Sequence, residues 1–158
     1  MNYRKLGKTN LMVSEIGFGG EWLERHPYEE SVELIKYASS KGINILDCWM
    51  ADPKPRSIIG DGIKENRENW YIQGHIGSTW KDSQYYKTRD MKYVVPAFED
   101  LLERLQTDYI DLGMIHFVDS EEEWDQIQNS DFLKFIFEQK KKGTVKHIGM
   151  SSHNPKVA

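Results

Sequence analysis

The sequence predicts an α/β protein whose strands form a parallel sheet. Short apolar runs rich in branched side chains alternate with longer segments in which apolar residues recur with helical period. Alternation of this kind is typical of β/α units, in which each helix packs on the sheet between two parallel strands. The clearest apolar run covers residues 43–47 and ends at a carboxylate, Asp47. Parallel strands present their carboxyl ends at one edge, so we expect the chemistry of the protein to gather there.

The composition fits a globular protein of the cytoplasm. Of 158 residues, 39% are hydrophobic and 29% charged, and no linker or low-complexity tract divides residues 1–158, so we expect a single domain. The net charge of −4 favours neither a nucleic-acid partner nor an anionic membrane surface. No apolar run approaches the roughly 20 residues of a membrane span, and the first residues lack the apolar core of a signal peptide. The single cysteine, Cys48, fits a reducing compartment.

The first half of the chain is predicted to contain a hairpin, three strands and two helices. A Gly/Asn turn at residues 7–10 connects the hairpin, and Gly42 ends the first helix. The predicted apolar face of that helix comprises Val32, Leu34, Ile35 and Ala38. The predicted elements are the hairpin 3–6 and 11–13, strands over 15–20, 43–47 and 70–76, and helices over 27–41 and 57–64.

The second half is predicted to contain a long loop, two further strands and two further helices. The polar segment 77–89 carries Tyr85 and Tyr86 and has the length of a functional lid. Ser120 and Glu123 have the spacing of a capping box. The predicted elements are a loop over 77–89, a helix capped by Asp90, strands over 109–116 and 145–151, a helix over 120–142 interrupted near Asn129, and the start of a helix at Asn154.

Several short motifs occur in a fixed order along the chain. They are YRxLGxT over residues 3–9, VSxIGxG over 13–19, GINxxD over 42–47, LxTDYIDL over 105–112 followed by Ile115-His116, and IGxS over 148–151. Each motif alone is weak. Together and in this order they resemble the opening and the second, fourth and fifth strands of the aldo-keto reductase family, and the resemblance covers the whole chain.

The resemblance implies a TIM barrel, a closed (β/α)8 fold with an N-terminal hairpin across its bottom, and NAD(P)-dependent reduction of a small-molecule carbonyl by hydride transfer. Such a barrel needs about 250 residues, whereas this chain offers the hairpin and about five strands. We therefore expect a partial barrel, incomplete at the C-terminus. It would be the N-terminal portion of a longer oxidoreductase and inactive alone. An open edge of this kind is expected to pair with another copy of the chain.

The resemblance also implies a catalytic set of Asp, Tyr, Lys and His at the strand tips, in which a group with a tuned pKa gives a proton to the carbonyl. Asp47 and His116 stand at the Asp and His positions. Asp52 stands where the family has Tyr, and His75 stands where it has Lys. These four residues are the candidate catalytic set, and its usual proton donor is missing.

Each candidate also has an ordinary structural explanation. Asp47 can be a strand-end acid that caps a loop, and His116 a packed side chain. Asp52 precedes a proline and has the features of a helix N-cap. In a catalytic site the proton could instead come from one of the two histidines, or from Tyr85 or Tyr86 of the long loop; otherwise the reaction differs.

The resemblance implies NADP, or NAD, as the cofactor. The positions that match the family's nicotinamide contacts are Gly19, Gly20, Trp22, Asp47, Ser151 and Ser152. The glycines can instead form a tight turn, and the serines ordinary loop hydrogen bonds. In the family, the pockets for the phosphates and the adenine come mainly from later strands, so this chain alone need not bind the cofactor. Some larger relatives carry an iron–sulfur segment, which here could lie only beyond residue 158.

Two other functions stay open. A zinc- or iron-dependent hydrolase could use Asp47, His75, His116 and His153, which converge on one face of the predicted barrel. Barrel metal sites usually place two histidines close together on one strand, and since that pair is missing, no metal site is assigned. A non-catalytic barrel that binds a nucleotide or a protein partner would fit the altered Tyr and Lys positions.

Overall fold

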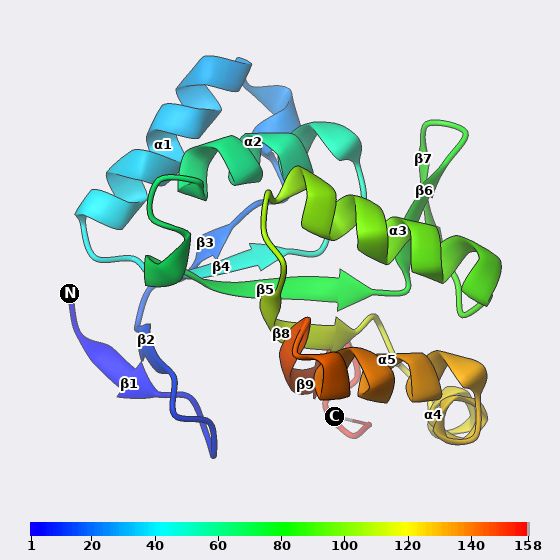
Figure 1. Cartoon of the computed structure of the whole chain (residues 1–158). Helices are drawn as coiled ribbons and strands as arrows, with labels where there is room; N and C mark the ends of the chain where they lie inside the picture. Colours follow the sequence, from blue (N-terminus) through cyan, green and yellow to red (C-terminus); the bar gives the residue numbers. More distant parts are fainter. Residues whose placement is uncertain (158) are drawn as a thin grey trace.

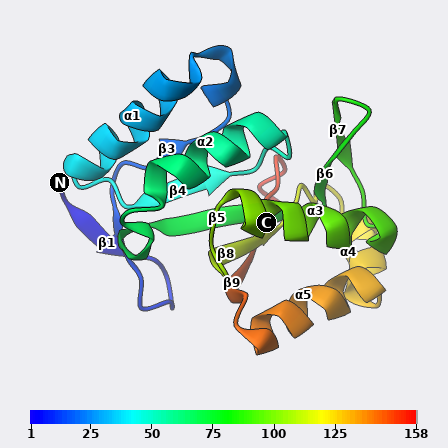
Figure 2. The same ribbon diagram turned by 45° about the horizontal axis from the view of Figure 1, so that its top comes forward.

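Five parallel strands form a curved sheet in the computed structural model, which describes residues 1–157. The strands follow the order β3-β4-β5-β8-β9 across the sheet, and two hairpins stand apart from it. Figures 1 and 2 show helices α1, α2, α3 and α5 packed around one face of the sheet. The strands are β1 Tyr3–Lys5, β2 Met12–Ser14, β3 Phe18–Gly19, β4 Ile45–Cys48, β5 Tyr71–Ile76, β6 Ser78–Lys81, β7 Gln84–Lys87, β8 Ile110–Ile115 and β9 Val145–Met150. The N-terminal hairpin and the five-stranded parallel sheet confirm the predicted partial barrel.

Side chains just before the helices determine where several of them begin. Asp52, Asp90, Ser120 and Ser130 each accept a hydrogen bond from a main-chain N–H group of the first turn. The predicted helix over 120–142 is two helices, with the expected interruption at Asn129. The helices are α1 Tyr28–Ser40, α2 Pro53–Ile63, α3 Met91–Arg104, α4 Glu121–Gln128 and α5 Asp131–Lys142, with short 3-10 turns η1 Leu23–Arg25 and η2 Arg67–Asn69.

The register of the parallel strands brings polar side chains together at one end of the sheet. Asp47 of β4 lies opposite Gln73 of β5, and residues paired in this way point to the same face. Leu46 and Ile72, the residues just before them, point to the other face and are fully buried with the helices. The alternation of the strands therefore separates a hydrophobic face from a polar one.

The hydrophobic core lies between the sheet and the helices. Each fully buried aliphatic side chain in this core contributes about 1.5–3 kcal/mol to the free energy of unfolding. Its members include Ile35, Leu46, Ile58, Ile59, Ile63, Ile72, Leu101, Leu105 and Ile136, all at most 1% exposed. Gly60 allows α2 to approach the end of α3, because a Cβ atom at this position would overlap the carbonyl group of Arg104. The close contact between these helices therefore requires glycine.

We expect Gly60→Ala to lower the free energy of unfolding by about 1–3 kcal/mol, the usual cost of overpacking. The added methyl group would meet the Arg104 main chain, which cannot rotate away as a flexible side chain could. This loss opposes the gain in helix propensity that alanine normally brings. Urea unfolding measures the difference. Gly19→Ala is the matched control, because an added Cβ there meets no atom within 4 Å; equal stability of the two variants would contradict the packing argument.

The prediction of a long loop over residues 77–89 is wrong. In this segment β6 and β7 form an antiparallel hairpin, with Trp80 opposite Tyr85. Its two-residue turn, Asp82-Ser83, has φ values of 50° and 61°, as hairpin turns of this length require. The turn contains neither Asn-Gly nor Asp-Gly, the usual hairpin signals, and the polar strands show no apolar alternation. Figure 1 shows the hairpin projecting beyond the ends of the parallel strands.

Smaller departures concern element boundaries and one core residue. Leu34 is 50% exposed, so its place in the predicted apolar face is wrong. The strand predicted over 15–20 is reduced to the two residues of β3, and α2 begins at Pro53, earlier than residue 57. The predicted helix start at Asn154 is seen as a turn up to residue 157, and residue 158 lies outside the described residues. None of the helices within residues 1–157 has the length and apolar character to span a membrane.

Candidate active site

A cavity of about 340 Å³ opens at the carboxyl ends of the parallel strands. Asp47 and Gln73 face it from paired positions of β4 and β5, and the two-residue period of a strand puts His75 on the same side as Gln73. His116 directly follows β8. The residues that line the cavity are Glu21, Asp47, Trp49, Gln73, His75, Tyr85, His116, Phe117, Ser151, Ser152 and His153.

Hydrogen bonds connect four of these side chains into one row, the Asp–His–His–Tyr row. The Nε2 atom of His75 lies 3.0 Å from Oδ1 of Asp47, and the Nδ1 atoms of His75 and His116 lie 2.9 Å apart. The hydroxyl oxygen of Tyr85 lies 2.7 Å from Nε2 of His116. Gln73 donates a further hydrogen bond to Oδ1 of Asp47 at 2.6 Å. The row therefore begins at a carboxylate held by Gln73 and ends at a phenol.

The carboxylate of Asp47 sets the direction of the hydrogen bonds in this row. A carboxylate only accepts hydrogen bonds, so Nε2 of neutral His75 carries the proton and donates it to Asp47. Nδ1 of His75 then accepts a hydrogen bond, which places a proton on Nδ1 of His116. Nε2 of His116 is left to accept from the hydroxyl group of Tyr85. With all rings neutral, this is the single arrangement that satisfies every ring nitrogen of the row.

Burial keeps His116 neutral. Its side chain is 5% exposed, and burial lowers its pKa from 6.5 to about 3, with the charges of His75 and Arg89 acting in the same direction. Burial also raises the pKa of Tyr85, although the Arg89 charge acts against this. At neutral pH the far end of the row is therefore a neutral imidazole beside a protonated phenol.

We expect the neutral state of His116 to make stability depend on pH. Its folded pKa, about 3, lies below the ordinary value of 6.5, so its contribution is fully present above pH 6.5 and is lost as pH falls toward 3. His116→Asn should flatten the decline in the free energy of unfolding between about pH 6.5 and about pH 5, above the titration range of most carboxylates. Urea unfolding at both pH values tests this, with the exposed His26→Gln as control. A decline that persists unchanged in His116→Asn would contradict the assignment.

Aromatic rings form the wall around the phenol end of the row. The ring of Trp49 stacks on His116 with a centroid distance of 5.8 Å and an interplanar angle of 6°. Tyr85 meets Trp49 edge to face at 5.4 Å. These contacts give the cavity an apolar wall beside the row and restrict the orientation of Tyr85.

Arg89 joins the base of the β6–β7 hairpin to the tip of β8. It donates a hydrogen bond to the main-chain carbonyl of His116 and pairs with Glu123 of α4 at 3.0 Å. Lys87, the last residue of β7, pairs with the same carboxylate at 2.8 Å. Only one half of the predicted capping box is seen, in which the Ser120 side chain accepts a hydrogen bond from the main-chain N–H of Glu123. The Glu123 side chain instead pairs with Lys87 and Arg89 at the base of the hairpin. The hairpin that carries Tyr85 is fixed to the same strand tip as His116.

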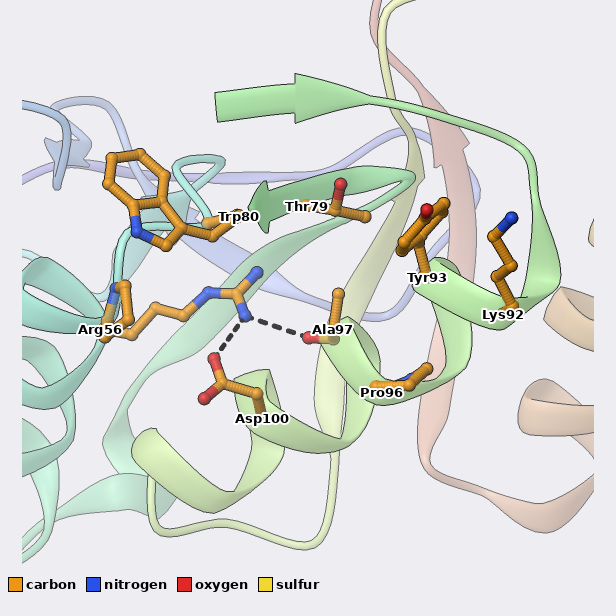
Figure 3. A pocket seen from close by; sticks show the side chains of 10 residues that line it. Arg56, Thr79, Trp80, Lys92, Tyr93, Pro96, Ala97 and Asp100 are labelled. Atoms are coloured by element: carbon orange, nitrogen blue, oxygen red, sulfur yellow. Dashed lines mark hydrogen bonds and ion pairs between the residues drawn. The ribbon is translucent and has the colours of Figure 1, made fainter. Parts of the chain in front are cut away.

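A second cavity, of about 270 Å³, lies between α2, α3 and the hairpin. Figure 3 shows Arg56 reaching into it, with Trp80 of the hairpin on one side and Ala97 and Asp100 of α3 on the other. The Arg56 side chain is 1% exposed, and its Nη1 atom donates to Asp100 at 2.8 Å and to the carbonyl of Ala97 at 2.9 Å. Because these partners compensate the charge, we interpret Arg56 as a structural residue that holds α2 against α3.

The structure brings together three of the four predicted catalytic residues. Asp47, His75 and His116 share the row, whereas Asp52 lies outside it: its carboxylate accepts from the main-chain N–H of Lys54 at 2.8 Å and caps α2. Asp52 is thus a helix N-cap, the ordinary structural role that the proline after it indicates. Asp52 therefore does not replace the tyrosine as the proton donor.

Sequence reasoning missed Gln73 and could not choose between two tyrosines. Gln73 precedes His75 by two residues, which in a strand means the same face, so its signal was present. Tyr85 lies in the row, whereas Tyr86 is 47% exposed and packs against Tyr93. The register of an unrecognised hairpin decides between them, and no local pattern in the sequence shows that register.

The residues predicted to contact the cofactor have different surroundings in the structure. Gly20 has a packing reason to be glycine, because a Cβ there would lie 2.8 Å from Ile59 and 2.9 Å from the carbonyl oxygen of Asp47. Gly19, in contrast, is exposed and faces open space. Trp22 is 50% exposed, and Arg25 lies 3.4 Å above its ring.

The two serines at the tip of β9 have different surroundings. Ser151 accepts a hydrogen bond from the main-chain N–H of Phe117 at 2.8 Å, and its hydroxyl oxygen lies 3.5 Å from Nδ1 of His75. Since that nitrogen accepts from His116 in the neutral row, the Ser151 hydroxyl hydrogen is left for a ligand. Ser152 instead donates toward Asp119, in the loop between β8 and α4, and toward the carbonyl of Asn154 in its own loop.

Within the described residues, no group of three or more His, Cys, Asp or Glu side chains is arranged to hold a metal ion. His153, the fourth residue of the hydrolase alternative, lines the cavity, but its Nδ1 atom lies 3.4 Å from Asp119 and its ring packs edge to face on Phe117. The other three candidates are hydrogen-bonded to one another within the row.

Comparison with known proteins gives a consistent result along the whole chain. The model of the aldo/keto reductase family matches residues 15–158. The uncharacterized oxidoreductase YqkF of Bacillus subtilis is 30% identical, over 99% of this chain and 51% of its own length. The holo form of an aldo-keto reductase from Bacillus halodurans has a TM-score of 0.83 at 26% identity, over 99% of this chain and 52% of that one.

A more distant structure shows the same fold with a bound nucleotide. It is an aldo/keto reductase from Klebsiella pneumoniae in complex with NADP and acetate, with a TM-score of 0.71 at 19% identity, over 93% of this chain and 48% of that one. This chain thus spans about half the length of the curated relative and of both solved structures.

Proposed function

Because this chain belongs to the aldo/keto reductase family, we propose that the protein is an NADP(H)-dependent oxidoreductase that reduces a small carbonyl compound in the 340 Å³ cavity. One observation carries the proposal: Asp47, His75 and His116 are hydrogen-bonded to one another at the ends of three adjacent parallel strands. Strand ends are where barrel enzymes place their chemistry. A row of titratable groups in a cavity is what proton transfer to a carbonyl requires.

Ser151, which lines the cavity, and Gly19 and Trp22, which lie outside its lining, support binding of the nicotinamide end of such a cofactor. The free hydroxyl hydrogen of Ser151 is suited to the oxygen of a carboxamide, and Gly19 leaves the open space that a flat ring needs near the main chain. Trp22 adds a half-exposed indole ring. When bound, the nicotinamide would supply hydride to the carbonyl carbon. Ser152, already engaged with Asp119 and the carbonyl of Asn154, is assigned no direct contact.

The cavity residues would hold the carbonyl compound and move its proton. Trp49 and Phe117 supply apolar surface, while the row and the other lining residues supply polar groups. A cavity of this size suits a short aldehyde or ketone and disfavours a bulky substrate.

One observation favours a second candidate function, a barrel that binds NADPH without turnover. The family's Tyr position is occupied by a helix cap, Asp52, and its Lys position by His75. A protein that lost its proton donor could keep the nucleotide site and become a binding protein.

We expect residues 1–158 to be inactive alone, so the test uses the full-length protein. Its titration with NADPH, followed by assay with short aldehydes, separates the two candidates. The proposed enzyme binds NADPH and consumes it when an aldehyde is added. Tight NADPH binding with no consumption on any of a panel of short aldehydes and ketones would overturn the reductase proposal and favour the binding protein. Metal analysis of the same sample is the corresponding test of the hydrolase alternative.

A further inference from the structure

The origin of the proton is the main chemical question that this cavity raises. Reduction of a carbonyl adds hydride to carbon and a proton to oxygen, and the residue at the family's Tyr position caps a helix instead. Tyr85 reaches the cavity from a different element, the β6–β7 hairpin, and among the described residues it is the one tyrosine that lines the cavity. Its residue is 36% exposed, and a small ligand in the cavity would lie beside it.

In the neutral row, however, Tyr85 cannot serve as an acid toward a ligand. Its only hydroxyl proton points to Nε2 of His116, 2.7 Å away. A carbonyl oxygen in the cavity would meet the lone pairs of the phenol and be repelled. The row must therefore change its hydrogen-bond direction before Tyr85 can donate.

One additional proton reverses the row. If His75 carries protons on both ring nitrogens, its Nε2–H still donates to Asp47 and its Nδ1–H donates to Nδ1 of His116. His116 then carries its proton on Nε2 and donates it to the oxygen of Tyr85. The Tyr85 hydroxyl proton is released toward the cavity. No heavy atom needs to move, because each contact works in either direction.

We propose that Tyr85 is the proton donor of this protein and that Asp47, His75 and His116 form a relay that holds the next proton and passes it to Tyr85. This proposal rests on the proposed reductase function. Tyr85 touches the substrate and is a catalytic residue, whereas Asp47, His75 and His116 act through it as positioning and relay residues.

The step balances in atoms and charge. As hydride from NADPH bonds to the carbonyl carbon, the Tyr85 O–H bond breaks and the proton forms the O–H bond of the alcohol. The Tyr85 oxygen takes the Nε2 proton of His116, and Nδ1 of His116 takes the Nδ1 proton of His75. The carbonyl is reduced, the nicotinamide is oxidised, and the row returns to its neutral arrangement. Water supplies the next proton.

The charges around the row determine where the additional proton resides. Asp47 and Gln73 touch His75, so a positive His75 is paired with a carboxylate that Gln73 holds in place. His116 faces positive groups and is buried, which keeps it the neutral member. The charged or titratable groups that face the row from outside it are Glu21, Lys87, Arg89 and His153. The carboxylate end therefore stores the proton, and the phenol end delivers it.

Nitrogen-15 NMR of the histidine rings tests the relay without any turnover. Near neutral pH, His116 should be protonated on Nδ1 and His75 on Nε2. On acidification, protonation of His75 should shift the His116 proton from Nδ1 to Nε2. His116 fixed on Nε2 at all pH values, or a change at His75 that leaves His116 unaffected, would overturn the relay.

Kinetics test the donor. Tyr85→Phe should lower kcat by about 10²- to 10⁴-fold, the usual contribution of general acid catalysis, with NADPH affinity unchanged. Tyr86→Phe, on the same strand but packed against Tyr93, is the matched control and should keep its kcat. If the unaltered protein turns over and Tyr85→Phe does so equally fast, the donor assignment fails while the reductase function stands. If the unaltered protein binds NADPH without turnover, the reductase function fails and the donor role fails with it.

Discussion

Asp47→Asn is expected to lower kcat for carbonyl reduction by about 10²- to 10⁴-fold. Asparagine keeps the size of the side chain but loses the charge that stabilises a protonated His75 at 3.0 Å. Its amide group can also donate to Nε2 of His75, which would move the His75 proton to Nδ1 and disrupt the relay. In nitrogen-15 NMR, Asp47→Asn should also place the His75 proton on Nδ1, a change that a purely structural role would not produce.

Asp52→Asn is the matched control for this experiment. Asparagine caps helices about as well as aspartate, so α2 should keep its start, and Asp52 lies outside the row. We expect its kcat and its histidine NMR signals to stay close to those of the unaltered protein. An Asp47→Asn variant with unchanged kcat and unchanged histidine NMR signals would show that the row does not take part in the reaction.

Asp111→Ala is expected to lower the free energy of unfolding by about 3–5 kcal/mol, the cost of leaving a buried partner charge unpaired. Asp111 of β8 is 7% exposed and pairs with Arg67 at 3.0 Å. Its Oδ2 atom also accepts from the main-chain N–H of Ile72 at 2.9 Å. The substitution would leave the Arg67 guanidinium, on a side chain only 11% exposed, and the buried N–H group of Ile72 without this acceptor, at the point where β5 and β8 begin to pair.

Asp108→Asn tests whether position within the motif or burial determines this effect. Asp108 belongs to the same LxTDYIDL motif but is exposed, and surface substitutions usually change stability by less than about 0.5 kcal/mol. Urea unfolding compares both variants with the unaltered protein. Similar losses for Asp108→Asn and Asp111→Ala would contradict the assignment of Asp111 as the buried anchor of the two strands.

Much of the fold could be predicted because its local signals agree with the global arrangement. The apolar run that ends at Asp47 became β4, and the caps Asp52, Asp90 and Ser120 begin helices as expected. The hairpin over 78–87 could not be predicted, because its strands are polar and its turn residues, Asp82-Ser83, lack the usual hairpin signal. Tertiary contacts through Arg89 and Glu123, distant in sequence, hold it in place.

The candidate site was predicted in part for the same reason. Asp47 and His75 lie near the ends of recognisable strands and His116 directly follows another, so their meeting at one edge follows from a parallel sheet. Tyr85 comes from the hairpin, and only the hairpin register and the Arg89 contact with His116 bring it to the row. The family's tyrosine is missing at position 52, and the tyrosine that we propose in its place, Tyr85, lies in a segment where no local sequence pattern indicates a site.

The most direct test of this account is a single-turnover measurement with NADPH-loaded full-length protein and excess short aldehyde, followed by the absorbance of the reduced nicotinamide. The account predicts rapid loss of absorbance in the unaltered protein and in Tyr86→Phe, and a loss about 10²- to 10⁴-fold slower in Tyr85→Phe at equal NADPH affinity. Equal rates in Tyr85→Phe and the unaltered protein would contradict it.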